Sequence, residues 1–127
     1  MVYNVRGWSD LVEWFGSEPS FHDAEVVTLC FSRDPEPSYL LVDLKKLSNK
    51  IDDHSKVFLV EKQCLVKISL YNIIYINISD WNHQNVIEKI LIDHYYECLE
   101  LKIISSFGLD LVVKCSKIEI SFCTNIL

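Results

Sequence analysis

The sequence contains little glycine and little proline, with three residues of each among 127. A phosphate-binding loop needs several closely spaced glycines, because its backbone N–H groups must approach the phosphate without side chains in the way. A nucleotide-binding loop of this kind is therefore not expected. The sequence also lacks an apolar run near the roughly 20 residues that a membrane-spanning helix needs, so no membrane contact is predicted.

The five cysteines include no C-x-x-C pair, which argues against a zinc knuckle or a thioredoxin-like motif. Several of them lie within alternating apolar segments, where a free cysteine behaves as a small buried hydrophobe. The first eight residues contain no apolar signal core. Together these features predict a soluble protein of the reducing cytoplasm. The cysteines are Cys30, Cys64, Cys98, Cys115 and Cys123.

Basic residues are scarce in the first third of the chain. Residues 1–43 contain eight acidic residues and two arginines, whereas residues 44–127 contain ten acidic and ten basic residues. The whole net charge of −6 therefore belongs to the first third. A protein that binds phosphates needs a basic face, so nucleic acid is not an expected ligand. The acidic third either attracts a basic protein partner or serves as a solvated surface that keeps the protein soluble.

Residues 8–15 have the pattern of a short amphipathic helix. Ser9 or Asp10 is the expected N-terminal cap, and Gly16 and Pro19 are expected to end the helix. A helix this short needs packing to hold it, so its apolar side is expected to lie on a sheet. The apolar residues at helical spacing are Trp8, Leu11, Trp14 and Phe15.

From residue 24 onward, apolar and polar residues alternate in short segments separated by turns, which is the pattern of strands. Because no helix-length segment connects them, neighbouring strands are expected to run antiparallel. The predicted fold is mainly β (α+β), an antiparallel sheet or sandwich of about eight strands with a short N-terminal helix, in one domain over residues 1–127. The strand segments are 24–32, 39–44, 57–61, 64–71, 73–79, 86–93, 98–104, 109–114 and 118–122.

Three segments carry more specific expectations. Residues 24–32 are apolar on both faces, which predicts an interior strand that is covered on both sides. Residues 45–56 are polar without a clear period, which predicts a surface loop. Residues 105–108 (Ser-Ser-Phe-Gly) predict the turn of a hairpin.

Residues 21–25 (Phe-His-Asp-Ala-Glu) are the strongest candidates for chemistry. His22 and Asp23 are the residue types of a general base and its orienting carboxylate. However, adjacent residues at the start of a strand point to opposite sides, which would separate His22 from Asp23 and place Asp23 beside Glu25. No G-x-S-x-G nucleophile motif is present. Three interpretations remain: a structural junction between helix and strand, a contact with a protein partner, and catalysis.

Residues 80–85 (Asp-Trp-Asn-His-Gln-Asn) are a second candidate. A loop that exposes Trp81 among amide side chains is suited to recognition, but it is equally suited to a turn whose amides bond to nearby backbone. A metal site needs three or four convergent ligands, and the histidines are dispersed, so no metal is expected. The histidines are His22, His54, His83 and His94.

Three segments of the chain together resemble one protein family. The stretch Trp14-Phe15-Gly16, followed by Pro19 to Val26, resembles the N-terminal signature of the immunity protein 50 family of bacterial polymorphic-toxin systems. Residues 82–87 are similar to its second motif, and residues 111–120 to its C-terminal block, in which a cysteine precedes a closing strand. The resemblance implies a small cytoplasmic protein that binds and neutralises a cognate toxin and has no enzymatic activity.

With such a function, the expected toxin contacts come from the first two motifs. An acidic surface suits a basic toxin such as a nuclease. No catalytic residue, metal ligand or cofactor is expected, and the sequence leaves the oligomeric state open. The alternatives are a small hydrolase-type enzyme using His22 and Asp23, and a β-sandwich module that binds a ligand through Trp81. The expected partner contacts are Glu18, His22, Asp23, Glu25, Trp81 and His83.

Overall fold

A computed structural model describes residues 4–124, which form one helix and one antiparallel sheet of eight strands. This confirms the predicted class, mainly β with a short N-terminal helix. The elements are α1 (Trp8–Phe15), β1 (Glu25–Cys30), β2 (Ser38–Ile51), β3 (Phe58–Tyr71), β4 (Tyr75–Ser79), β5 (Val86–His94), β6 (Leu99–Phe107), β7 (Asp110–Cys115) and β8 (Lys117–Cys123). The strand order is β4-β7-β6-β5-β1-β2-β3-β8.

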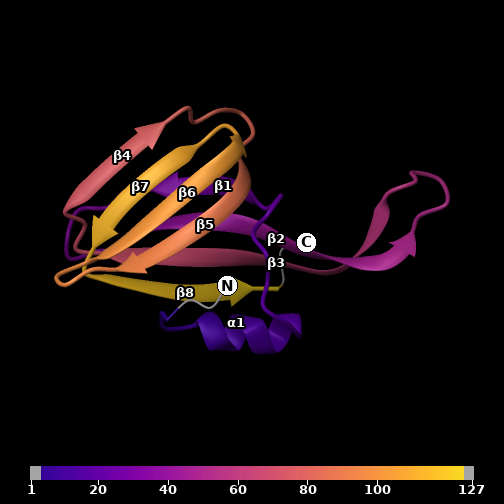
Figure 1. Cartoon of the computed structure of the whole chain (residues 1–127), viewed down its shortest axis with the longest axis horizontal. Helices are drawn as coiled ribbons and strands as arrows, with labels where there is room; N and C mark the ends of the chain where they lie inside the picture. Colours follow the sequence, from indigo (N-terminus) through magenta and orange to yellow (C-terminus); the bar gives the residue numbers. More distant parts are fainter. Residues whose placement is uncertain (1–3, 125–127) are drawn as a thin grey trace.

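The sheet bends over itself, so that its two halves enclose one core. Figure 1 shows β4, β7, β6 and β5 lying across β2, β3 and β8. At the bend, between β1 and β5, the ladder contains a single residue pair, Glu25 with Val86. The residues around this pair therefore join the two halves. Buried side chains from both halves belong to one apolar cluster, among them Leu40, Val66, Leu101 and Val113.

Helix α1 begins at a glycine rather than at a side-chain cap. Gly7 precedes it with a φ of 92°, and no side chain caps its first turn, so the predicted cap by Ser9 or Asp10 is wrong. The chain lies against β8 at this point: the Ile120 N–H donates to the Arg6 carbonyl at 2.8 Å. A Cβ on Gly7 would lie 1.7 Å from the Ile120 oxygen, so this approach requires glycine.

The end of α1 and its packing agree with the prediction. Gly16 ends the helix in the left-handed conformation, with its N–H donating to the Val12 carbonyl at 2.9 Å. Trp8, Leu11 and Phe15 are buried, and Figure 1 shows the helix beside β8. None of the described residues forms a helix with the length and apolar character needed to cross a bilayer.

The predicted surface loop at residues 45–56 is wrong for residues 45–51, because β2 continues to Ile51, and correct for residues 52–56, since β3 begins only at Phe58. The segments predicted as strands 57–61 and 64–71 are thus one strand. We call residues 47–60 the arm, which Figure 1 shows projecting from the body of the sheet. Both faces of such a ribbon meet solvent, so no apolar period is required. Its exposed apolar residues are Leu47, Ile51, Val57, Phe58, Leu59 and Val60.

The root of the arm is attached to the end of α1. Lys46 and Lys62 are partners across β2 and β3. The Lys46 ammonium donates to the Phe15 carbonyl at 3.0 Å, and the Lys62 ammonium donates to the Trp14 carbonyl. Each ammonium also lies over the ring of the same residue, 5.4 and 5.3 Å from its centre. Cations bonded to the last carbonyls of a helix are stabilising, so these contacts hold the end of α1 against the root of the arm.

Two further expectations are only partly correct. β1 lies inside the sheet as predicted, and Val26 is buried, but Val27 is 44% exposed. The prediction that both faces of β1 are covered is therefore wrong, because α1 packs along β8 instead. The turn predicted at 105–108 starts too early: β6 runs to Phe107, and the chain reverses at Gly108.

Candidate functional site

The segment after Phe21 joins the two halves of the sheet through backbone hydrogen bonds. The Asp23 N–H donates to the Ile87 carbonyl at 2.9 Å, and the Ile87 N–H donates to the Ala24 carbonyl at 2.8 Å. The Val26 N–H donates to the Asn85 carbonyl at 2.9 Å. The first two sequence motifs therefore meet in space. Their backbone bonds hold β1 against β5 beyond the single pair of the ladder.

Asn85 has a structural role in the second motif. Its side chain is buried, and its Oδ1 accepts hydrogen bonds from the Asn82 and Leu109 N–H groups, both at 3.0 Å. Its Nδ2 donates to the Asn82 carbonyl at 3.0 Å. A Cβ on Gly108 would lie 2.6 Å from this Oδ1. Asn85 thus ties the loop at 82–85 to the turn between β6 and β7.

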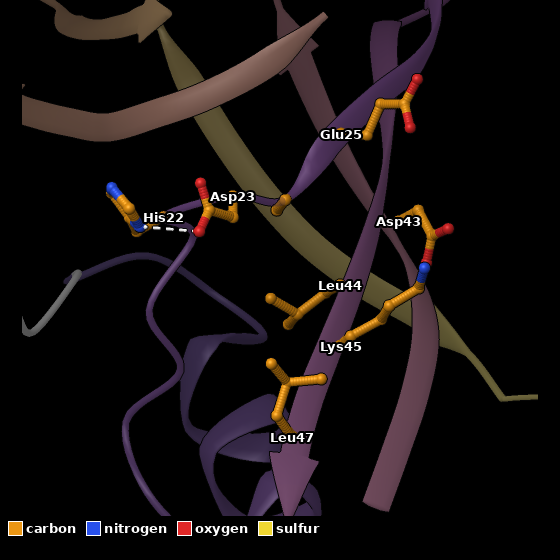
Figure 2. A pocket seen from close by; sticks show the side chains of 8 residues that line it. His22, Asp23, Glu25, Asp43, Leu44, Lys45 and Leu47 are labelled. Carbon is orange, nitrogen blue, oxygen red and sulfur yellow. Dashed lines mark ion pairs between the residues drawn. The ribbon is translucent and has the colours of Figure 1, made fainter. Parts of the chain in front are cut away.

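The His22 imidazole lies between two carboxylates. Its Nδ1 is 3.2 Å from Asp23 Oδ2, and its Nε2 is 3.3 Å from Glu88 Oε2. Figure 2 shows the contact with Asp23. The prediction that His22 and Asp23 point apart is therefore wrong. β1 begins only at Glu25, and Asp23 has a φ of 67°, so the alternation of a strand does not apply to these residues.

This arrangement does not resemble the activation of a nucleophile. Each ring nitrogen of His22 faces a carboxylate, so neither is directed at a hydroxyl or thiol that it could deprotonate. A protonated imidazole donates to both carboxylates, whereas a neutral one donates to only one. The side chains of His22 and Glu88 are each about half exposed, and ion pairs this exposed contribute little to stability.

Two hollows flank His22, which lines both of them. The first has a volume of about 190 Å³, and Figure 2 shows the side chains around it. The second has a volume of about 240 Å³. The first is lined by His22, Asp23, Ala24, Glu25, Asp43, Leu44, Lys45 and Leu47, and the second by Glu18, Pro19, Ser20, Phe21, His22, Glu88, Lys89 and Ile90.

The structure brings together four of the predicted contact residues, Glu18, His22, Asp23 and Glu25, and adds two acids that sequence reasoning missed. Asp43 and Glu88 both lie in predicted strands. Their proximity to His22 depends on strand register, which the local pattern does not specify. We call five residues the acidic cluster: Glu18, Asp23, Glu25, Asp43 and Glu88.

One pair in the acidic cluster opposes the stability of the sheet. Glu25 of β1 and Asp43 of β2 are direct cross-strand partners, and like charges in this position are destabilising. The Gln63 Nε2 donates to Asp43 Oδ1 at 2.9 Å, which satisfies part of that carboxylate. The two facing carboxylates place negative charge beside the first hollow, which Lys45 also lines.

Trp81 and His83, the other predicted contacts, are not among the described residues that line the two hollows. The His83 ring packs edge-on against Phe107, with 5.9 Å between ring centres, and its Nδ1 lies 2.7 Å from Asn82 Oδ1. Trp81 is 48% exposed. Neither residue lines the hollows around which the acidic cluster lies.

The buried thiols are poor nucleophiles. Burial raises the pKa of Cys64 and of Cys115 to about 11, so both are protonated near neutral pH and the reactive thiolate is rare. Among residues 4–124, no group of three or more His, Cys, Asp and Glu side chains is arranged to hold a metal ion.

The chain matches a known protein family. The model of the family described as immunity protein 50 matches residues 7–125, which include α1, both hollows, the arm and all eight strands described. This confirms the resemblance found in the sequence. No curated protein and no solved structure gave a significant match.

Proposed function

The chain belongs to the immunity protein 50 family, and from this membership we propose that it binds a cognate protein toxin in the cytoplasm and neutralises it without an enzymatic reaction of its own. The observation that supports a binding role most directly is the acidic cluster. Its carboxylates surround two hollows, and the facing pair Glu25 and Asp43 costs the sheet stability. A cationic partner group would offset that repulsion.

The proposed partner is a toxin with a basic surface, such as a nuclease. A nuclease carries lysine and arginine side chains where it meets phosphates. The acidic cluster would occupy that surface in place of the nucleic acid and so block the substrate. The scarcity of bases in residues 1–43 favours the approach of a basic toxin, although Lys45 and Lys89 also line the hollows.

The arm supplies an apolar extension of the same surface. Leu47 lines the first hollow together with Asp23 and Glu25, so the exposed apolar residues of the arm begin where the acidic cluster ends. Interfaces commonly combine apolar anchors with charged groups at their rim. We include Trp81 and His83 as a separate proposed contact, because Trp81 exposes an aromatic side chain.

The hydrolase alternative is less well supported than toxin binding. Catalysis by His22 would need a ring nitrogen directed at a nucleophile, and both ring nitrogens face carboxylates. A ligand-binding module that uses Trp81 would need an aromatic pocket around it, whereas the two hollows beside His22 are lined mainly by charged and aliphatic residues.

The test is binding to the toxic domain encoded beside the gene for this chain. We expect the double charge reversal Asp23→Lys with Glu25→Lys to weaken binding at least about tenfold, or about 1.4 kcal/mol, as measured by isothermal titration calorimetry. The matched control reverses Glu13 and Glu36, which are exposed acids outside the cluster. It changes the net charge equally and should weaken binding less than about threefold.

The possible outcomes distinguish an error in the proposed function from an error in the proposed contact surface. If the wild-type chain neither binds the toxin domain nor protects cells that co-express it, the immunity function is wrong. If the wild-type chain binds and both double variants bind equally well, the function stands but the acidic cluster is not the contact surface.

A further inference from the structure

Strand β4 (Tyr75–Ser79) forms an open edge of the sheet. It pairs with β7 on one side, and within residues 4–124 no strand pairs with its other side. The opposite edge, β8, is partly covered, because Arg6 forms a bridge with Glu119 and α1 packs beside it. β4 therefore leaves a row of backbone N–H and C=O groups available to another strand.

The composition of this edge favours pairing. Native edge strands are normally protected by charged residues, proline or bulges. Residues 71–79 (Tyr-Asn-Ile-Ile-Tyr-Ile-Asn-Ile-Ser) contain no charged residue and no proline. Isoleucine and tyrosine also have high strand propensity. Nothing in this segment discourages the addition of a further strand.

The core side of β4 is incompletely covered. Ile76 is the partner of Val113 and Ile78 that of Leu111, and both partners are buried. Cross-strand partners share a face of the sheet, so both isoleucines point toward the core. Each is nevertheless 40% exposed, and the adjacent Ile74 is 70% exposed. An added strand would cover these three side chains.

We propose that β4 pairs with β4 of a second copy of this chain, antiparallel and around a twofold axis at Ile76. In this register Ile76 meets Ile76 of the partner subunit, and Ile74 meets Ile78 of the partner subunit. The three isoleucines are spaced symmetrically about Ile76 in the sequence, so this register places isoleucine opposite isoleucine. A twofold interface requires this self-complementarity.

The backbone geometry agrees with this register. The Ile74 N–H donates to the Lys114 carbonyl at 2.8 Å, toward β7. The backbone groups of Lys114 therefore face β4, and those of its ladder partner Tyr75 face β7. Because backbone groups of successive strand residues point to alternate sides, those of Ile76 and Ile78 point toward the open edge. With Ile76 on the axis, its N–H and C=O lie opposite those of Ile76 of the partner subunit, and the two residues exchange both hydrogen bonds.

The charge distribution favours a second copy at this edge. Each chain has a net charge of −6, which opposes association in general, but that charge belongs to residues 1–43. β4 and its neighbours β7, β6 and β5 belong to the balanced part of the chain. In the proposed register Asp80 lies opposite Asn72 of the partner subunit, so no acid meets an acid. A basic toxin finds no acid within residues 71–79 to attract it.

The test is sedimentation velocity over about 1 to 200 µM protein, since dimerisation depends on concentration. We expect the wild-type chain to dimerise and Ile76→Lys to raise the dimer dissociation constant at least about tenfold, with an unchanged circular dichroism spectrum. The matched control is Ile104→Lys. Ile104 is similarly exposed at 37% but lies in β6, inside the sheet, so this variant should dimerise like the wild type.

A crosslink tests the register itself. Ile76→Cys, in a chain whose exposed Cys123 is replaced by serine, should form a disulfide-linked dimer under mild oxidation, and Ile104→Cys should not. The proposal is overturned if the wild-type chain is monomeric up to about 200 µM, or if Ile76→Lys dimerises normally. If the chain is monomeric and Ile76→Lys abolishes toxin binding, the edge at β4 binds the toxin and not a second copy.

Discussion

At the scale of single residues, the first two motifs each contain a side chain with a different role. Asn85 is buried and bonds to the backbone of Asn82 and Leu109, so it holds the fold. His22 is half exposed between two carboxylates, so the fold does not depend on it strongly. The two motifs, which are joined by backbone hydrogen bonds, therefore contain both a structural residue and a surface residue.

Asn85→Ala is expected to lower the free energy of unfolding by about 2–3 kcal/mol. The substitution leaves the Leu109 N–H, which is buried with its residue, without an acceptor, and an unsatisfied buried donor costs about 1–3 kcal/mol. The loss of the other two hydrogen bonds adds to this cost. Urea denaturation followed by circular dichroism measures the change.

The control for Asn85 is Asn82→Ala. The Asn82 side chain accepts a hydrogen bond from the exposed His83 N–H, so this substitution should cost less than about 1 kcal/mol. Equal destabilisation by both variants would mean that the loop as a whole, and not the Asn85 side chain, holds β5 in place.

At the scale of elements, the sequence pattern was most informative where an element is amphipathic. The spacing of Trp8, Leu11 and Phe15 predicted α1 with its observed ends. The alternation of apolar residues located most strands, because one of their faces is buried. Most of the arm was missed for the same physical reason: an isolated ribbon has no buried face, so its strands carry no alternation. Only residues 57–60 of the arm lay within a predicted strand.

The start of α1 provides a matched pair of glycines. Gly7 and Gly16 have almost the same φ, 92° and 88°, but a Cβ on Gly7 would lie 1.7 Å from the Ile120 oxygen, whereas a Cβ on Gly16 would meet only the Lys46 ammonium at 3.5 Å. Gly16→Ala should cost about 1 kcal/mol from backbone strain. Gly7→Ala should cost more than about 3 kcal/mol, because β8 must separate from the helix entry.

Thermal and urea denaturation of the two glycine variants measure this difference. If Gly7→Ala were no more harmful than Gly16→Ala, the contact between Arg6 and Ile120 would not determine where α1 begins.

At the scale of the whole molecule, the main feature is that the net charge and the open edge at β4 belong to different parts of the chain. The acidic cluster and the root of the arm share one hollow, while the open edge at β4 belongs to the part of the chain without net charge. The molecule therefore has two chemically different surfaces, which are the proposed contacts with a toxin and with a second copy.

The charge asymmetry predicts a salt-dependent association with the toxin. Between about 20 mM and about 500 mM NaCl, the association rate constant should fall at least about tenfold, because salt screens the attraction between the acidic surface and a basic toxin. The dissociation rate constant should change less. Surface plasmon resonance measures both constants, and an association rate that did not depend on salt would exclude steering by charge.

The amino-acid sequence by itself determined the helix, most of the strands, the mainly β class and the family, because these depend on local periodicity and on short motifs. The tertiary structure alone decided that His22 contacts both Asp23 and Glu88, that Asp43 faces Glu25, that residues 47–60 form an arm, and that β4 is an open edge. These features depend on the left-handed conformation of Asp23 and on pairing between distant strands. Pairing of this kind is set by the packing of the whole core, which no local pattern encodes.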